Sequence, residues 1–225
     1  MSAKFDAPPP PSQDLLAAVG QMKPVRTRSR WGAFVAVLAF AVMVPAYTLL
    51  RGPLRRDLGD LPPAWVAAGA ALWALGFVLS LAAALVPARG DVLPSGARAS
   101  RVSLLAMGAL ILFVGLGPAS VPGVSLHPAD AGMTLLQSLV HCGKYVLMVG
   151  GLALLAGFVA LRRMLPVGRG RIGAAVGAAG GALGGLALHF ICPIATTPHV
   201  LLGHVGGMIL AAIAGALILP AALRR

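Results

Sequence analysis

Two short stretches carry most of the side chains that could do chemistry. Residues 188–204 read LHFICPIATTPHVLLGH, and residues 137–147 read QSLVHCGKYVL. Thiolates and imidazoles bind soft divalent metals such as zinc, and two thiols can oxidise to a disulfide. The candidates for sensing, metal binding or redox chemistry are Cys142, Cys192, His141, His189, His199 and His204.

Three interpretations of these residues stay open. A disulfide between Cys142 and Cys192 would link two segments on an oxidising side of a membrane. A zinc ion or another soft divalent metal would take about four ligands, and the candidates are Cys142, Cys192, His189 and His204. Oxidation of the thiols or imidazoles would alter helix packing. Without any of these reactions, the histidines would simply hydrogen-bond to backbone or water.

The composition indicates the setting of these residues. The chain has 225 residues, of which 58% are hydrophobic and 11% charged. Its mean hydropathy is +0.89. Soluble domains carry about 25% charged residues, so this chain belongs to the membrane class. The net charge of +12 comes from Lys and Arg in short segments between apolar runs, which favours control of topology over nucleic-acid binding.

Six apolar stretches are long enough to cross a bilayer as helices, which takes about 20 residues each. Their residues do not alternate between apolar and polar, as a β-barrel would require. We therefore expect an all-α, polytopic protein with a six-helix transmembrane domain at 31–223. The expected spans are 31–50, 64–85, 102–121, 139–161, 172–192 and 200–222.

The basic residues set the expected orientation. Lys and Arg concentrate before the first stretch, after the second and fourth, and at the tail. The positive-inside rule then puts both termini on the cytoplasmic side of a bacterial inner membrane. The loop with Arg51, Arg55 and Arg56 opposes this assignment. In the N-in, C-in arrangement the His/Cys residues lie at the outer face.

The fifth stretch has a glycine at every fourth position, namely Gly173, Gly177, Gly181 and Gly185. Such a stripe lets another helix approach closely. We expect tight packing inside one subunit, and a homodimer seam is the alternative.

Residues 1–30 form a separate cytoplasmic arm. Ser12 is a suitable N-cap for a short helix that Pro24 ends. Its apolar face would carry Leu15, Leu16, Val19 and Met22. Such a helix would order in the groove of a partner protein, or it would lie on the inner leaflet of the membrane lipid.

Several chemistries have no motif here. The chain lacks a GxxxxGK[ST] loop, HExxH and GxSxG, and its acidic residues lie outside the apolar stretches. These absences argue against an enzyme, and the lack of an intramembrane acid argues against ion transport.

Two regions resemble a known family. The arm sequence DLLAAVGQMKPVRTRSRW is similar to the N-terminus of the NrsF-type transmembrane anti-sigma factors, and Cys142 corresponds to one of their characteristic cysteines. LHFICP resembles their LHCP-like segment, with two extra residues between His189 and Cys192. The resemblance implies that the arm holds a sigma factor of the extracytoplasmic-function (ECF) type until an envelope stress releases it. The stress would be metal or redox stress, or singlet oxygen if the chain is close to a light-responsive regulator of carotenogenesis.

Two other functional classes stay open from the residues. One is a membrane redox protein in which His189 and His204 ligate haem. The other is a small metal transporter that uses the His/Cys residues as its entry site.

Overall fold

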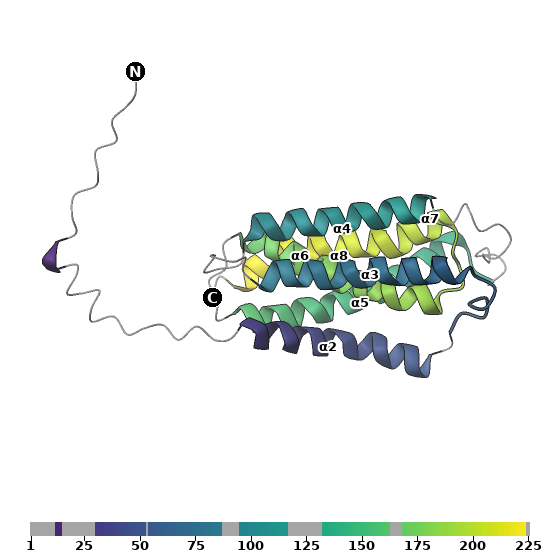
Figure 1. Cartoon of the computed structure of the whole chain (residues 1–225), viewed down its shortest axis with the longest axis horizontal. Coiled ribbons are helices and arrows are strands. Elements are labelled where there is room, and N and C mark those ends of the chain that lie inside the picture. Colours follow the sequence, from purple (N-terminus) through teal and green to yellow (C-terminus); the bar gives the residue numbers. More distant parts are fainter. Residues whose placement is uncertain are drawn as a thin grey trace, which may run out of the picture.

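The computed structural model describes residues 12–14, 30–52, 54–86, 95–116, 132–162 and 168–223. Within them, the long helices lie side by side in one elongated bundle (Figure 1). The helices are α2 (Arg30–Arg51), α3 (Pro63–Leu85), α4 (Gly96–Leu116), α5 (Leu135–Leu161), α6 (Arg169–Ile191), α7 (Thr197–His199), the π-helix η3 (Val200–Val205) and α8 (Gly206–Ala222).

Five helical segments among the described residues are long and apolar enough to cross a membrane. They are α3, α4, α5, α6 and the continuous segment from α7 through η3 to α8. The regular elements of the described residues are therefore helices, as predicted, and five of the six predicted spans coincide with segments that could cross a membrane. α2 coincides with the first predicted stretch and packs against α5 and α6.

Some helices begin earlier than predicted. α4 begins at Gly96 rather than 102, because a helix continues beyond the hydrocarbon layer where Arg98 and Arg101 face solvent. α5 begins at Leu135 rather than 139, because Thr134 and Gln137 form a capping box. α4 ends at Leu116, and the rest of its predicted span lies outside the described residues.

α6 is the central helix, and it contacts every other long helix. Its glycines allow this. A Cβ on Gly177 would collide with the carbonyl oxygen of Ala211 in α8, and one on Gly181 would lie 2.6 Å from the Cα of Met208. The glycine stripe therefore packs against neighbouring helices of the same chain, and these glycines are buried.

The rest of the stripe follows the same rule. A Cβ on Gly173 would meet the carbonyl of Gly215 in α8, and one on Gly185 would meet the ring of Trp73 in α3.

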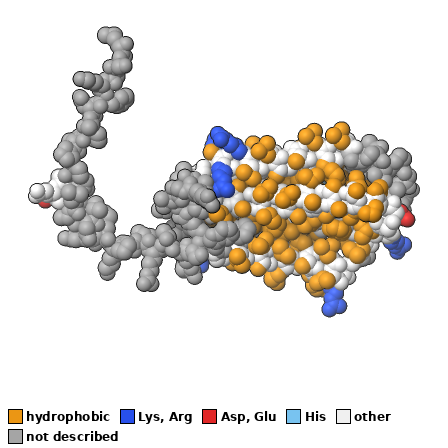
Figure 2. Space-filling model, in the orientation of Figure 1, with side chains coloured by type: hydrophobic (Ala, Val, Ile, Leu, Met, Phe, Trp, Pro, Cys, Tyr) orange, Lys and Arg blue, Asp and Glu red, His pale blue; other side chains and the backbone are white. Residues whose placement is uncertain are grey.

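Hydrophobic side chains cover the visible outer surface of the bundle, and charged side chains gather at its ends (Figure 2).

The two ends of the bundle carry different parts of the chain. α2 begins at the end where the chain terminates, and α7 lies at the opposite end (Figure 1). In the arm, only residues 12–14 are described, and Gln13 and Asp14 are helical after Ser12. The predicted docking residues Leu15, Leu16, Val19 and Met22 lie outside the described residues.

Candidate functional site

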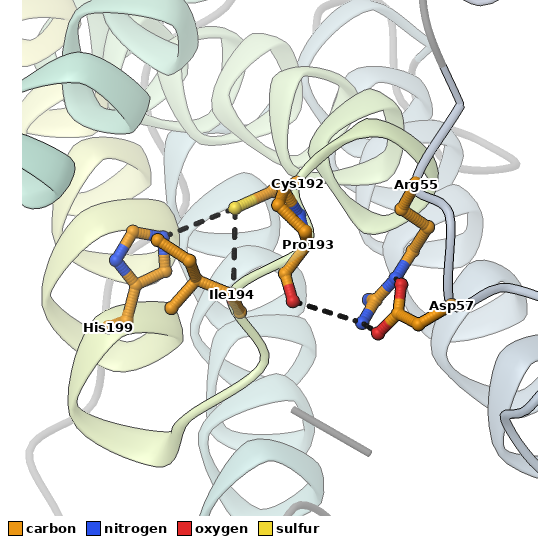
Figure 3. Close-up of polar contacts among 6 residues, drawn as sticks. All are labelled: Arg55, Asp57, Cys192, Pro193, Ile194 and His199. Atoms are coloured by element: carbon orange, nitrogen blue, oxygen red, sulfur yellow. Dashed lines mark hydrogen bonds and ion pairs between the residues drawn. The ribbon is translucent and has the colours of Figure 1, made fainter. Parts of the chain in front are cut away.

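The two cysteines meet at the end of the bundle that carries α7. Cys142 lies on the inner face of α5, and Cys192 caps the C-terminus of α6. Both are buried free thiols, and their sulfurs are 3.7 Å apart. Cys192 Sγ also lies 3.3 Å from Nε2 of the fully buried His199 (Figure 3). The sequence prediction that these thiols converge is therefore consistent with their positions in the structure.

A π-turn adds His204 to the group. His199 and His204 are five residues apart, so in an α-helix their side chains would point about 140° away from each other. η3 widens the turn, as the bond from Gly206 N–H to Leu201 O shows, and the two imidazoles come into edge contact with centroids 5.3 Å apart. Inserted π-turns frequently mark functional sites.

These four residues form a compact set of ligand atoms. One atom each from Cys142, Cys192, His199 and His204 lies within 4.8 Å of the others, and all four residues are buried. We call this set the Cys2His2 cluster. A tetrahedral ion with zinc–sulfur bonds of about 2.3 Å would hold its two sulfurs about 3.8 Å apart. The observed 3.7 Å separation fits that geometry.

Ser138 supports one tautomer of His199. The Ser138 hydroxyl lies 2.7 Å from the carbonyl of Leu135, to which it can donate. With its proton in that bond, its oxygen can accept from Nδ1–H of His199, which lies 3.1 Å away. The Nε2 lone pair of His199 then faces Cys192 and is free to accept a thiol proton or to bind a metal. This is the outer-shell support that metal-ligating histidines usually have.

His189 does not join the cluster. Its Nε2 lies 3.0 Å from the carbonyl oxygen of Val66, its ring packs against Trp65 at 5.0 Å, and the ring occupies space left by Gly69. The ligand set predicted from the sequence therefore changes by one residue, with His199 in place of His189. The reason is that His199, at the end of α7, faces Cys192, whereas His189 faces Val66 in α3.

His141 also lies apart from the cluster. It is exposed on α5, one residue before the buried Cys142. Consecutive helix residues point about 100° apart, and on α5 it is Cys142 that faces the bundle interior.

An ion pair holds the backbone beside Cys192 from its other side. The side chain of Arg55 is 2% exposed, and its Nε lies 2.7 Å from Asp57 Oδ1. Its Nη2 donates to the other carboxylate oxygen and to the carbonyl of Pro193 (Figure 3). The Arg55 backbone N–H donates to Phe190 O at 2.9 Å. We call this the Arg55 clamp, because it ties the loop after α2 to the end of α6.

A haem site does not fit this arrangement. His189 and His204 both line one cavity. The volume of that cavity, measured as the space that the centre of a water molecule can occupy, is only about 20 Å³. That space suits about one water rather than a porphyrin. His189 is also committed to Val66.

Sequence reasoning missed three parts of the site. Ser138 was within reach, because it lies one helical turn before Cys142 and so on the same face. The Arg55 clamp and the contact of His189 with Val66 join segments more than 120 residues apart. No local sequence pattern predicts such contacts.

The comparisons with known proteins bear on the whole chain. The family model described as NrsF, negative regulator of sigma F, matches residues 16–224. No curated protein and no solved structure matches the chain. The match covers the arm from Leu16 onward as well as all the helices, and the family consists of regulators of a sigma factor. The chain therefore belongs to the NrsF family of negative regulators of sigma factors.

Proposed function

We propose that this protein is a membrane-bound anti-sigma factor that holds an ECF-type sigma factor through its cytoplasmic arm. The observation that carries the proposal is the family match, because it begins inside the arm and continues through the bundle. In this proposal residues 1–30 are the sigma-binding arm. Residues 31–223 form the transmembrane domain in a bacterial inner membrane. α2, the first helix along the chain, joins the other five spans to make six, and both termini lie in the cytoplasm.

The charges of the described residues support this orientation. The bundle end that carries the arm also carries five arginines, namely Arg98, Arg101, Arg162, Arg169 and Arg171. At the opposite end Arg51 and Arg56 are exposed, while Arg55 is buried and paired with Asp57, so the charge of Arg55 is neutralised within the loop. This pairing weakens the objection that the loop after α2 raised to an N-in topology.

The Cys2His2 cluster supplies the sensing site in this proposal. Its two sulfurs and two imidazole nitrogens suit a soft divalent metal, such as zinc or cadmium. They are equally suited to an envelope redox signal, including singlet oxygen generated by light. A signal at Cys192 would move Pro193, and the Arg55 clamp would pass that movement to α2. The arm follows directly from the other end of α2.

The sigma-binding claim is tested by retention of a sigma factor. Full-length protein from native membranes should co-purify one, as identified by mass spectrometry. Leu15→Glu or Val19→Glu should release it and switch on its target genes, because a buried apolar face would acquire a charge. If full-length protein retains no sigma factor, or if repression survives both changes, the arm is not the docking element.

The sensing claim is tested separately. Cys142→Ser and Cys192→Ser should retain the sigma factor but lose its release by cadmium or by an oxidant. An unaltered response in both variants would contradict a role for the thiols.

A further inference from the structure

Arginines surround the joint where α4 and α6 begin. Gly96, the first residue of α4, packs on the start of α6, since an added Cβ there would lie 2.8 Å from the carbonyl oxygen of Gly168. The two helices therefore begin side by side, at the bundle end from which the arm extends (Figure 1). The first two turns of these helices carry Arg98, Arg101, Arg169 and Arg171.

The bundle itself does not compensate these charges. Apart from Asp14 in the arm, the described acidic residues are Asp57 and Asp60, in the loop after α2 at the opposite end. Neither α4 nor α6 has an acid in its first turn. The start of a helix is the positive end of its dipole, so an anion is stabilised there and a cation is not. Arg162 differs, because it caps the C-terminus of α5, where the dipole favours a cation.

The guanidinium groups keep most of their donors available. Arg98 Nη1 donates to the carbonyl of the residue that caps α3, and Arg169 Nη1 to that of the residue that caps α8, both at 3.1 Å. Arg101 and Arg171 are exposed and bond to no residue that the structure describes. Since a guanidinium has five N–H donors, these groups can together hold an anion with several oxygens.

The exposed side of α4 continues from the arginines into an apolar surface. At about 100° per residue, the side of α4 opposite Gly96 carries Arg98 and Arg101. Leu105 and Leu112 share that side, and their side chains are 75% and 65% exposed. The face from Arg101 to Leu112 is about 16 Å long, roughly half the thickness of a hydrocarbon core. Figure 2 likewise shows basic side chains at this end directly beside the hydrophobic surface.

We propose that this side of α4 binds an anionic phospholipid of the cytoplasmic leaflet. The lipid phosphate lies between Arg98 and Arg101, and an acyl chain follows Leu105 and Leu112. The inference rests on the proposed function, whose orientation puts this end of the bundle at the cytoplasmic leaflet. Arginine is suited to the phosphate because its planar fork makes two parallel hydrogen bonds to it. An acidic protein surface would match the charges but would not cover the apolar side of α4.

Native mass spectrometry of the full-length protein in detergent tests the headgroup. It compares phosphatidylglycerol, which is anionic, with phosphatidylcholine of the same acyl chains, which has no net charge. We expect phosphatidylglycerol to bind about 25-fold more tightly, the combined effect of two arginines near a phosphate. The double variant Arg98→Gln, Arg101→Gln should bind the two lipids alike.

A matched pair of single variants tests the position of the charge. Arg101→Gln should weaken phosphatidylglycerol binding about fivefold, the effect of one arginine. Its binding of phosphatidylcholine should be unchanged, which would show that the variant is folded. Arg162→Gln removes the same charge from an exposed arginine at the same end of the bundle. It should leave phosphatidylglycerol binding nearly unchanged.

Glycerol 3-phosphate tests the apolar half of the site, because it has a phosphate but no acyl chain. In large excess it should fail to displace phosphatidylglycerol. Displacement would overturn the proposal, since the arginines alone would then hold the ligand. Equal affinity for the two lipids, or an equal loss in Arg101→Gln and Arg162→Gln, would overturn it as well and leave only attraction by net charge.

Co-purification of a sigma factor separates the lipid from an acidic protein surface. Arg101→Gln should retain the sigma factor, because its lost charge faces lipid. If Arg101→Gln keeps full affinity for phosphatidylglycerol but loses the sigma factor, the arginines dock that protein and the lipid site is wrong. The lipid measurements themselves involve no sigma factor, so they succeed or fail independently of the proposed function.

Discussion

At the scale of single residues, the proton on Ser138 decides what His199 can do. When the hydroxyl donates to Leu135, its oxygen accepts from His199 Nδ1–H, and that tautomer directs the Nε2 lone pair toward Cys192. In the proposed metal site, Ser138 would thus orient a ligand without binding the metal itself. Its importance follows from hydrogen-bond geometry rather than from its own chemistry.

We therefore predict that Ser138→Ala weakens cadmium binding by about tenfold to a hundredfold, the usual effect of removing an outer-shell partner. Titration of the cadmium–thiolate absorbance in purified protein measures the affinity. Ser100→Ala is the matched control, because Ser100 Oγ bonds only the carbonyl of Ala97 on α4, in the same i to i−3 pattern. Equal affinities in both variants would mean that Ser138 does not orient His199.

At the scale of elements, the loop after α2 depends on one buried ion pair. The loop contains Arg55, which is buried, and Arg56, which is exposed. Arg55→Ala should lower the free energy of unfolding by about 3 kcal/mol, because it leaves Asp57 largely buried without its partner. Arg56→Ala should have little effect. Thermal unfolding in detergent compares the two.

The Arg55 variant also separates stability from signalling. If the clamp transmits the signal, Arg55→Ala should bind cadmium but fail to release the sigma factor at a temperature where the protein stays folded. A normal release would show that the signal takes another route to the arm.

The glycines of α6 give a second prediction at this scale. Gly177→Ala should cost about 1–3 kcal/mol in the free energy of unfolding, because the new Cβ meets the carbonyl of Ala211 and the helices must separate. Gly151→Ala on α5 is the control, since no atom lies within 4 Å of its added Cβ. It should be neutral or stabilising by up to about 1 kcal/mol, since alanine favours the helix. Equal stabilities would place the α6–α8 contact elsewhere.

The helices were predictable from sequence because their signals are local. Hydrophobic runs of membrane length and the four-residue glycine spacing specify spans and a packing face directly. The cluster was only partly predictable. Cys142 and Cys192 follow from their positions near helix ends. The inward position of His204 depends on a π-turn, and the exclusion of His189 depends on its contact with Val66. Both are consequences of packing between distant segments.

At the scale of the whole molecule, the proposed function requires that the two ends of the bundle face different compartments. α2 has 22 residues and so extends about 33 Å between the arm and the loop held by the Arg55 clamp. That length matches the hydrocarbon core of a bilayer, which is about 30 Å thick. A signal received at the cluster would thus travel the full width of a membrane along one helix.

This arrangement predicts which residues a membrane-impermeant maleimide can reach. Gly59 is exposed in the loop after α2 with no atom near its added Cβ, and Ser12 is exposed in the arm. In a background with both native cysteines changed to alanine, Gly59→Cys should be labelled in intact cells. Ser12→Cys should be labelled only after the cells are permeabilised. If both cysteines react from the same side, the arm and the cluster share a compartment, and a signal at the cluster would not need to cross the membrane to reach the sigma factor.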